Sequence, residues 1–388
     1  MTLSTFDLRS QYLLDPRVAY LNHGAFGATA IAILEERERL LRAIEANPTR
    51  MFMRELKADV DAALEDLALV LKVPSRTLAF TSNATVGLNL VARSLMPTLH
   101  EGDEVLLTDV EYGSQLNLWE FVCERRGARL RVVPVCGVPA DDVPRLVESH
   151  LSDRTRIMLM SHITSLTALR LPVEEVSGLL RRSGVTFVVD GAHAPGHIPL
   201  DLPGTGADYY VANLHKWFAA PRPSGFIYAN AEAQSRLDPL VVNWGGTDRG
   251  TSLAERTHYP GTADASPWLT VPAALAFHEA ILSPARPHAR ALLADAAEAL
   301  AALSFERLGR EDDDLLMSSW WLPPGLDADA LRAELASDHI EAIVDRQGDR
   351  PVLRACVAWY TLESEVNRLL DACGRALERP SKGNGTTE

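Results

Sequence analysis

The sequence has few basic residues for its length, and this deficit argues against two classes of partner. Its 388 residues contain 38 Lys and Arg against 52 Asp and Glu, a formal net charge of −14 at pH 7. Proteins that bind nucleic acids usually carry a basic face, and proteins that bind anionic membranes carry clusters of Lys and Arg. We therefore expect neither nucleic acid nor a membrane surface as a partner.

Cysteine and long apolar runs are also scarce. The four cysteines form no CxxC pair, so neither a zinc ribbon nor a disulfide scaffold is indicated. No run of about 18 apolar residues is present, and the N-terminus lacks a basic segment followed by an apolar one. We expect a cytoplasmic protein whose reduced thiols fill packing positions: Cys123, Cys136, Cys356 and Cys373.

Helical and β-rich stretches alternate along most of the chain, as in a sheet that is covered by helices on both faces. Helical periodicity first covers 29–46 and 55–72. Further helices are expected to end at Leu95 and Arg126 and to span 173–183. The β-rich runs are 79–82, 104–110, 130–135, 156–163, 185–190, 209–213 and 225–229. The pattern predicts an α/β fold with a mostly parallel sheet.

The pattern changes near Pro272. Two Ala- and Leu-rich helices, 272–282 and 285–303, precede a strand–helix–strand–strand–helix pattern that ends near Leu377. We expect a large domain over 22–271 and a smaller α+β domain formed by 1–21 and 272–378. A glycine-rich loop is expected at 243–251, and a disordered tail at 379–388.

Three local patterns suit a small-molecule site, and each also has an ordinary explanation. In 80–95 a strand runs into a helix whose first N–H groups attract anions, but an N-cap explains the same residues. Asp190 ends a buried strand, where open α/β sheets bind ligands, or it is a turn residue. Lys216 lies among apolar residues that would lower its pKa, or it extends along the surface.

The three patterns together match the parts that pyridoxal 5′-phosphate (PLP) requires. PLP needs an anion site for its phosphate, an acid beside its pyridine nitrogen and a lysine for the Schiff base. The chain has neither a Walker A motif nor GxGxxG, so nucleoside triphosphates and dinucleotides have no support. A different phosphorylated ligand on a doubly wound sheet is the remaining alternative.

Several longer stretches resemble the class V aminotransferase family, which has fold type I of the PLP enzymes. They are similar to its isopenicillin N epimerase-like branch over nearly the whole chain. The resemblance implies a mostly parallel seven-stranded sheet in the large domain and PLP as the cofactor. The matching stretches are 20–28, 47–56, 81–95, 102–117, 161–175, 188–202, 207–217, 260–275 and 353–366.

The resemblance also implies a role for each matching residue. Lys216 is expected to form the Schiff base, Asp190 to pair with the pyridine nitrogen, and His193 to lie near the ring hydroxyl; these three are the catalytic residues. The other implied cofactor contacts are Asn83, Ala84, Thr85, Tyr112 (by ring stacking), Ser165, Asn213, His215 and Thr262. Thr262 is expected to reach the phosphate of the neighbouring subunit, so a homodimer is implied. The implied substrate contacts are Asn22, His23 and Arg354.

The reaction is the least determined part of this interpretation. We expect β-elimination from a cysteine S-conjugate, because the branch includes enzymes that process such substrates in lincosamide-type biosynthesis. Amino-acid epimerisation, decarboxylation coupled to oxidative deamination, and a non-catalytic PLP-binding protein are the alternatives. Two departures from the branch weaken the epimerase expectation: Leu166 and the segment APRPSG at 220–225. Substrate choice is expected to depend on 243–259. His193 and His197 lack an evident third ligand, so no metal is expected.

Overall fold

The computed structural model describes residues 5–242, 252–258, 261–310 and 314–378. It divides into two compact units. The large unit comprises Thr29–Ser165 and Arg170–His278, and the small unit comprises Met1–Ala28, Leu166–Leu169 and Glu279–Glu388. The domain boundaries expected from the sequence stay a prediction, and the expected tail at 379–388 and loop at 243–251 lie outside the described residues.

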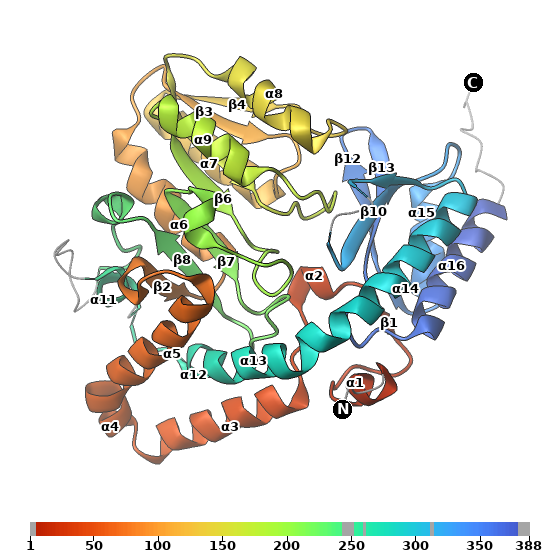
Figure 1. Ribbon diagram of the computed structural model, residues 1–388, viewed down its shortest axis with the longest axis horizontal. Helices are drawn as coiled ribbons and strands as arrows, with labels where there is room; N and C mark the ends of the chain where they lie inside the picture. The colour runs from red at the N-terminus through yellow and green to blue at the C-terminus, as the bar shows by residue number, and fades with distance from the viewer. Residues whose placement is uncertain (1–4, 243–251, 259–260, 311–313, 379–388) are drawn as a thin grey trace, which may run out of the picture. The chain divides into compact units, whose positions relative to one another are not determined.

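A seven-stranded sheet forms the centre of the large unit (Figure 1). Its strand order is β2-β8-β7-β6-β5-β3-β4, and β8 alone runs antiparallel to its neighbours, so the expectation of a mostly parallel sheet is confirmed. The strands are β2 (Leu78–Thr81), β3 (Glu104–Thr108), β4 (Arg129–Val133), β5 (Thr155–Ser161), β6 (Thr186–Asp190), β7 (Tyr209–Asn213) and β8 (Gly225–Ala229).

Helices cover both faces of this sheet, because its strands carry apolar side chains on each side. On one face, α6 (Ala84–Leu95) and α7 (Gly113–Arg126) pack on the alternate residues of the strands. On the other, α8 (Val143–His150) packs beside α9 (Val173–Arg182). The sequence did not predict α8, whose short amphipathic repeat includes Pro144 in its first turn. The core under α6 and α7 includes Leu88, Val91, Val105, Leu107, Trp119, Leu159, Val188, Val211 and Ile227.

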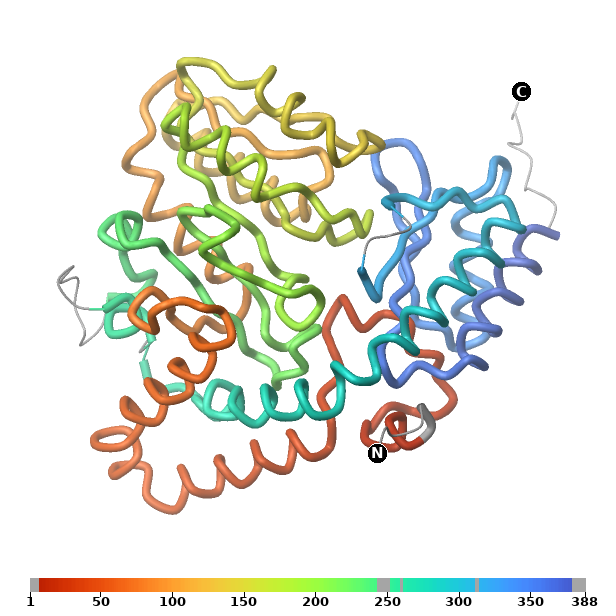
Figure 2. The backbone as a smooth tube through the Cα atoms, viewed as in Figure 1, coloured from red at the N-terminus to blue at the C-terminus, as the bar shows by residue number. Residues whose placement is uncertain are grey.

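The first long helices of the large unit pack against a segment from much later in the chain. They are α3 (Ile31–Ala46) and α5 (Leu56–Leu71), which contact α12 (Ser266–Leu269) and α13 (Val271–Phe277), as the tube in Figure 2 shows. The predicted ends of α3 and α5 agree with the structure to within two residues. The shorter segments are α4 (Pro48–Arg50), α10 (Leu202–Thr205), α11 (Leu253–Thr257) and a π-helix (Met51–Glu55).

The small unit is an antiparallel sheet with helices. Its strand order is β12-β13-β10-β9, and a short parallel pair joins β1 to β11. The predicted strand–helix–strand–strand–helix pattern has one strand before its first helix, whereas the structure has two strands there. The elements are α1 (Thr5–Ser10), β1 (Ala19–Tyr20), α2 (His23–Phe26), α14 (Ser283–Ala302), β9 (Glu306–Leu308), β10 (Met317–Trp321), α15 (Ala328–Ser337), β11 (Ile340–Glu341), β12 (Ile343–Gln347), β13 (Arg350–Cys356) and α16 (Glu363–Glu378).

The predicted helix break near 283 is absent from the structure. A π-helical turn (His278–Leu282) leads directly into α14, which has Pro284 in its first turn. Proline is tolerated there because the first N–H groups of a helix have no partner within the helix. None of the described helices is long and apolar enough to cross a membrane.

The residue after β6 has no space for a side chain. Gly191 donates its N–H to the Val211 carbonyl at 2.8 Å, and a Cβ built on Gly191 would lie 1.9 Å from the Tyr210 ring. The ring is enclosed within the sheet and cannot move away without a wider shift. A glycine is therefore required for β6 and β7 to come together at this edge.

We expect Gly191→Ala to lower the free energy of unfolding by about 1–3 kcal/mol, as overpacking of a filled core does. Gly374→Ala is the matched control, because its Cβ would meet nothing within 4 Å inside α16. That variant should gain about 0.5–1 kcal/mol from helix propensity. The measurement is the urea midpoint followed by tryptophan fluorescence, and equal midpoints for the two variants would contradict the steric argument.

Candidate functional site

The carboxyl-terminal edge of the large sheet brings together the predicted catalytic residues. Parallel strands end at the same edge, so the residues that follow β5, β6 and β7 become neighbours. Asp190 is the last residue of β6 and is buried, and its Oδ1 accepts from the Ala192 N–H at 2.9 Å. Burial raises the pKa of Asp190, while the Ala192 hydrogen bond and the charge of Lys216 act in the opposite direction.

Lys216 differs in its surroundings from the other lysines that the structure describes. Its Nζ lies 3.0 Å from Nε2 of His193, and its side chain is partly buried. The chain has four lysines. Lys57 and Lys72 are exposed and pair with surface carboxylates, and Lys382 lies outside the described residues. The amine beside the imidazole is therefore the one whose setting suits a base or a nucleophile.

The indole of Trp217 favours one tautomer of His193. Its indole Nε1–H donates to Nδ1 of His193 at 3.4 Å, and an indole can only donate. In the neutral imidazole the proton is thus on Nε2, which faces the amine of Lys216. The indole ring is held in place by stacking on His197, with ring centroids 3.9 Å apart. In this tautomer the Nε2–H of His193 is a hydrogen-bond donor that faces Lys216. Only the neutral amine can accept that hydrogen bond, so the tautomer favours the neutral form of Lys216.

The start of α6 is tied to the end of β7. The Ala84 N–H donates to Oδ1 of Asn213 at 2.8 Å, and Oδ1 of Asn83 accepts from the Val86 N–H at 2.9 Å. Thr85 is exposed in this first turn. The positive end of a 12-residue helix therefore lies at the same sheet edge as Asn213, and helix N-termini of this kind bind phosphate.

His215 is the residue before Lys216 and the second residue after Asn213. Its Nδ1 is 2.7 Å from the carbonyl oxygen of Ser224, and burial lowers its pKa to about 4. The imidazole is therefore neutral at physiological pH. Gly225 follows Ser224, and a Cβ there would lie 2.5 Å from the Ala212 carbonyl oxygen. The backbones of β7 and β8 approach closely at this edge as a result.

The remaining predicted cofactor contacts are more exposed. Tyr112 is the residue before α7, and 53% of its side chain is accessible. Ser165 is partly buried after β5, and Thr262 is exposed. Of the substrate-selecting segment 243–259, only 252–258 is described. There His258 is partly buried, its Nε2 accepts the Phe80 N–H at 2.6 Å, and loss of hydration of the imidazole lowers its pKa to about 3.

The three predicted substrate contacts come together in the small unit. Arg354 is buried on β13, and its Nη2 donates to Oδ1 of Asn22 at 2.6 Å. His23 follows Asn22 in the sequence and is buried, and its Nδ1 lies 2.8 Å from the hydroxyl of Tyr360. Asn22 and Arg354 are 332 positions apart in the sequence and were predicted to share one site, and in the structure they are hydrogen-bonded to each other. A buried guanidinium of this kind suits a carboxylate ligand.

Sequence reasoning missed two groups at the edge of the large sheet. Glu111 is buried and accepts three hydrogen bonds from Thr108 and Ser161. Trp217 contacts His193 as described above. The only sequence signal for Glu111 was an acidic residue directly before Tyr112, and nothing local to Trp217 indicated its partner.

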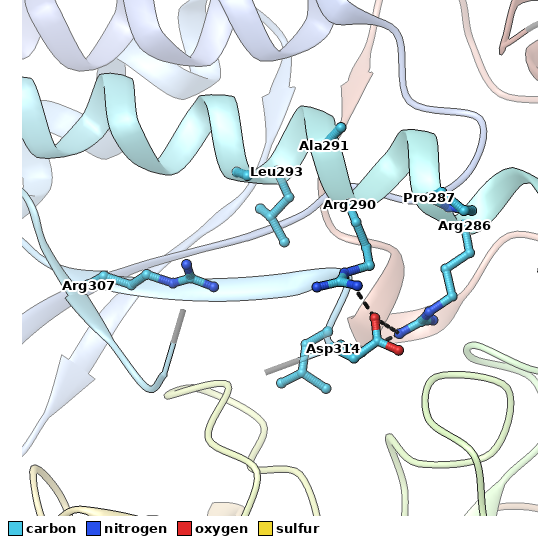
Figure 3. Close-up of a pocket in the computed structure, with 9 residues that line it drawn as sticks. Arg286, Pro287, Arg290, Ala291, Leu293, Arg307 and Asp314 are labelled. Atoms are coloured by element: carbon cyan, nitrogen blue, oxygen red, sulfur yellow. Dashed lines mark hydrogen bonds and ion pairs between the residues drawn. The ribbon is translucent and has the colours of Figure 1, made fainter. Parts of the chain in front are cut away.

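A cavity of about 500 Å³ lies within the small unit (Figure 3). Arg286 and Arg290 of α14 both point to Asp314, with N–O distances of 3.2 and 2.9 Å. Arg307 lines the same cavity and donates to Oγ of Ser318 at 3.0 Å. None of the predicted site residues lines it. Within the described ranges, no group of three His, Cys, Asp or Glu residues could hold a metal ion.

Comparison with known proteins identifies the family. A family model described as aminotransferase class-V matches residues 19–369. Isopenicillin N epimerase of Streptomyces clavuligerus is 35% identical over 390 residues, which cover 94% of this chain and 96% of the epimerase.

Solved structures agree with this match. The cystine C–S lyase C-DES, in complex with its product cysteine persulfide, has a TM-score of 0.81 at 25% identity, over 94% of this chain and 98% of the lyase. In a mutant of C-DES, glycine is covalently linked to the PLP cofactor. Cysteine desulfurase CsdA of Escherichia coli shares the fold, with a TM-score of 0.81 at 23% identity over 97% of this chain and 99% of CsdA. The chain therefore belongs to the class V aminotransferase family, as its sequence had indicated, and is a PLP-dependent enzyme of fold type I.

Proposed function

We propose that this enzyme is a C–S lyase that removes the Cα proton of a cysteine S-conjugate and releases its thiol by β-elimination. The observation that carries the proposal is the 3.0 Å contact between Lys216 Nζ and His193 Nε2. An amine and an imidazole in contact form one acid–base unit. β-Elimination needs only one such unit, which takes the proton from Cα and returns a proton to sulfur.

The residues at the sheet edge fit PLP by their chemistry. Lys216 supplies the amine for a covalent link, and the buried carboxyl of Asp190 suits the pyridine nitrogen. Asn83, Ala84 and Thr85 begin the helix whose N-terminus suits the phosphate. When bound, PLP supplies an electron sink for the negative charge that forms at Cα.

The chain's own residues then account for the proton transfers. Lys216 accepts the proton from Cα, and His193 holds the amine in position through its Nε2. The Cα–H and Cβ–S bonds break, a Cα–Cβ double bond forms, and the sulfur leaves with a proton from the Lys216–His193 unit. Hydrolysis of the unsaturated product gives pyruvate and ammonia. That Arg354, with Asn22 and His23, binds the substrate carboxylate stays a prediction.

Relatives support both this proposal and one rival. The lyase C-DES cleaves a C–S bond and matches nearly the whole chain. Epimerisation is the second candidate, and the observation in its favour is the 35% identity to isopenicillin N epimerase over 94% of this chain. Epimerisation requires protons to be exchanged on both faces of Cα, for which a single amine–imidazole unit is less suited. A homodimer with Thr262 at the shared site, and a cytoplasmic location, stay predictions.

The deciding experiment is mass spectrometry of an S-substituted L-cysteine incubated with the holoenzyme in D₂O. Release of pyruvate and free thiol is the expected result. Intact substrate that carries deuterium at Cα, without thiol release, would replace the lyase proposal with the epimerase. Loss of carbon dioxide with an aldehyde product would instead indicate decarboxylation coupled to oxidative deamination.

We expect Trp217→Phe to lower kcat by about 3–10-fold. Phenylalanine keeps an aromatic ring against His197 but removes the N–H that fixes the His193 tautomer, and one such hydrogen bond contributes about 0.5–1.5 kcal/mol. The neutral amine of Lys216 should then form only at higher pH, so the acidic limb of the kcat profile should move upward. Trp268→Phe is the control, since its Nε1–H donates to the Thr81 carbonyl instead. An unchanged pH profile in Trp217→Phe would contradict the assigned tautomer.

A further inference from the structure

Glu111 is a buried carboxyl that the proposed reaction does not use. It lies three residues after β3, and only 8% of its surface is accessible. Oε1 accepts from the Thr108 hydroxyl at 2.6 Å and the Ser161 N–H at 3.0 Å, and Oε2 lies 2.5 Å from the Ser161 hydroxyl. Its partners therefore come from the ends of both β3 and β5.

Ser161 connects Glu111 to the end of β6. In the parallel pairing of β5 with β6, Ser161 is the partner of Asp190. The next residue, His162, donates its N–H to the Asp190 carbonyl at 2.9 Å. One carboxyl follows β3 and the other ends β6, and the end of β5, which lies between these two strands, contacts both. The charge of Asp190 acts on Glu111.

The groups around Glu111 provide no compensating positive charge. In the part of the chain that the structure describes, no basic side chain pairs with its carboxyl. Tyr210 on β7 and His162 after β5 are in hydrogen-bond contact with each other at 2.9 Å. Both are neutral, because burial raises the pKa of Tyr210 well above its ordinary value and lowers that of His162 to about 3. The charge of Arg170 acts on these two groups. Asp109 accepts from the backbone of the segment after β4 instead.

Burial raises the pKa of Glu111 to about 7, and the charge of Asp190 acts in the same direction, against three hydrogen bonds that lower it. Burial raises the pKa of Asp190 as well, but the charge of Lys216 opposes this effect. Two carboxyls in one enclosed site do not both ionise readily. Asp190 is the carboxyl proposed to face the cofactor's ring nitrogen, whereas no basic side chain of the described residues pairs with Glu111. We therefore expect the negative charge on Asp190 and the proton on Glu111.

We propose that Glu111 is a positioning residue whose buried carboxyl keeps its proton up to near-neutral pH and thereby limits the negative charge at the cofactor nitrogen to that of Asp190. When Glu111 ionises, a second negative charge develops beside Asp190. That second negative charge raises the proton affinity of the cofactor's ring nitrogen. The inference rests on the proposed role of Asp190, and it does not depend on whether the reaction is elimination or epimerisation.

The first test uses the apoenzyme and needs no activity. A carboxyl whose folded pKa lies above its ordinary value binds its proton more tightly in the folded state, so its contribution to stability falls as pH rises from about 4.5 to 7. We expect the difference in urea midpoint between wild type and Glu111→Gln to change across this range and to be constant above it. A difference that is independent of pH would overturn the proposal.

The second test follows the visible absorbance of bound PLP during a pH titration of the holoenzyme. Glu111→Gln keeps the shape of the side chain but cannot acquire the charge, so the cofactor should lose its proton at lower pH, with about tenfold weaker proton affinity. Glu104→Gln is the matched control: Glu104 is also buried and accepts from Ser152 and Arg131, but it lies at the opposite end of β3. If the absorbance of PLP bound to Glu111→Gln titrates at the same pH as in the wild type, Glu111 has a purely structural role.

A third variant covers the case in which Glu111→Gln does not fold. Ser161→Ala retains the carboxyl and removes one hydroxyl that donates to it, so the pH range over which the apoenzyme loses stability should extend upward. An unchanged range would overturn the inference. Asp190→Asn separates the two proposals. If this variant leaves the cofactor titration unchanged, the proposed role of Asp190 is wrong. If Asp190→Asn alters the titration and Glu111→Gln does not, only the inference about Glu111 is wrong.

Discussion

Lys216→Ala should abolish turnover, with kcat lowered by about four orders of magnitude, the upper end of what a positioned base contributes. The variant removes both the amine proposed for the covalent link and the base that lies 3.0 Å from Nε2 of His193. The chain contains four lysines, and the structure places neither Lys57 nor Lys72 at the sheet edge. No other described lysine can therefore replace Lys216.

The measurement is steady-state kcat with the substrate identified by mass spectrometry, together with circular dichroism to establish that the fold is retained. Lys57→Ala is the control, because it removes an exposed amine that pairs with Asp61 on α5. It should leave kcat unchanged. Wild-type activity in Lys216→Ala would exclude this lysine as the base and with it the proposed reaction.

Asp190→Asn should lower kcat by about 10²–10³-fold, the range found when one preorganised electrostatic partner of a transition state is removed. Asparagine keeps the shape of the side chain, and its oxygen can still accept the Ala192 N–H. What it lacks is the negative charge that we propose keeps the ring nitrogen protonated. The visible spectrum of the bound cofactor should change along with kcat.

Asp208→Asn provides the matched control for Asp190→Asn. Asp208 is also a carboxylate beside β6, but it accepts the Phe187 N–H at 2.8 Å, at the opposite end of the strand. We expect this variant to lose stability and to retain its kcat and its spectrum. If Asp190→Asn behaved in the same way, the carboxyl of Asp190 would have a structural role only.

Much of the large unit could be predicted from the sequence because local patterns specify each element. The buried runs that became β6 and β7 are continuous in apolar residues, as strands covered on both faces must be. Asp190 and Lys216 are candidates from the sequence because one ends such a run and the other comes shortly after the next, and parallel strands end at a common edge. The prediction was less complete for short elements such as α8, whose eight residues give a weak periodic signal.

Contacts between distant segments could not be predicted in this way. His193 and Lys216 are 23 positions apart, and their 3.0 Å contact requires two loops to approach each other. Gly191 beside the Tyr210 ring and Gly196 beside the Trp217 carbonyl are the positions that allow this approach. A sequence pattern reports the surroundings of one residue, and it contains no information on which other loop fills the space beside it.

The sequence by itself determined most helices and strands of the large unit, its mostly parallel sheet and the residue types that suit PLP. It did so because periodicity and strand-end residues are local properties of the chain. Only the tertiary structure decided which nitrogen of His193 faces Lys216 and that Glu111 shares its site with Asp190. The strand order β2-β8-β7-β6-β5-β3-β4 places β3, β5 and β6 side by side although long segments separate them in the chain. Burial in that arrangement, rather than residue type, sets the pKa of Glu111.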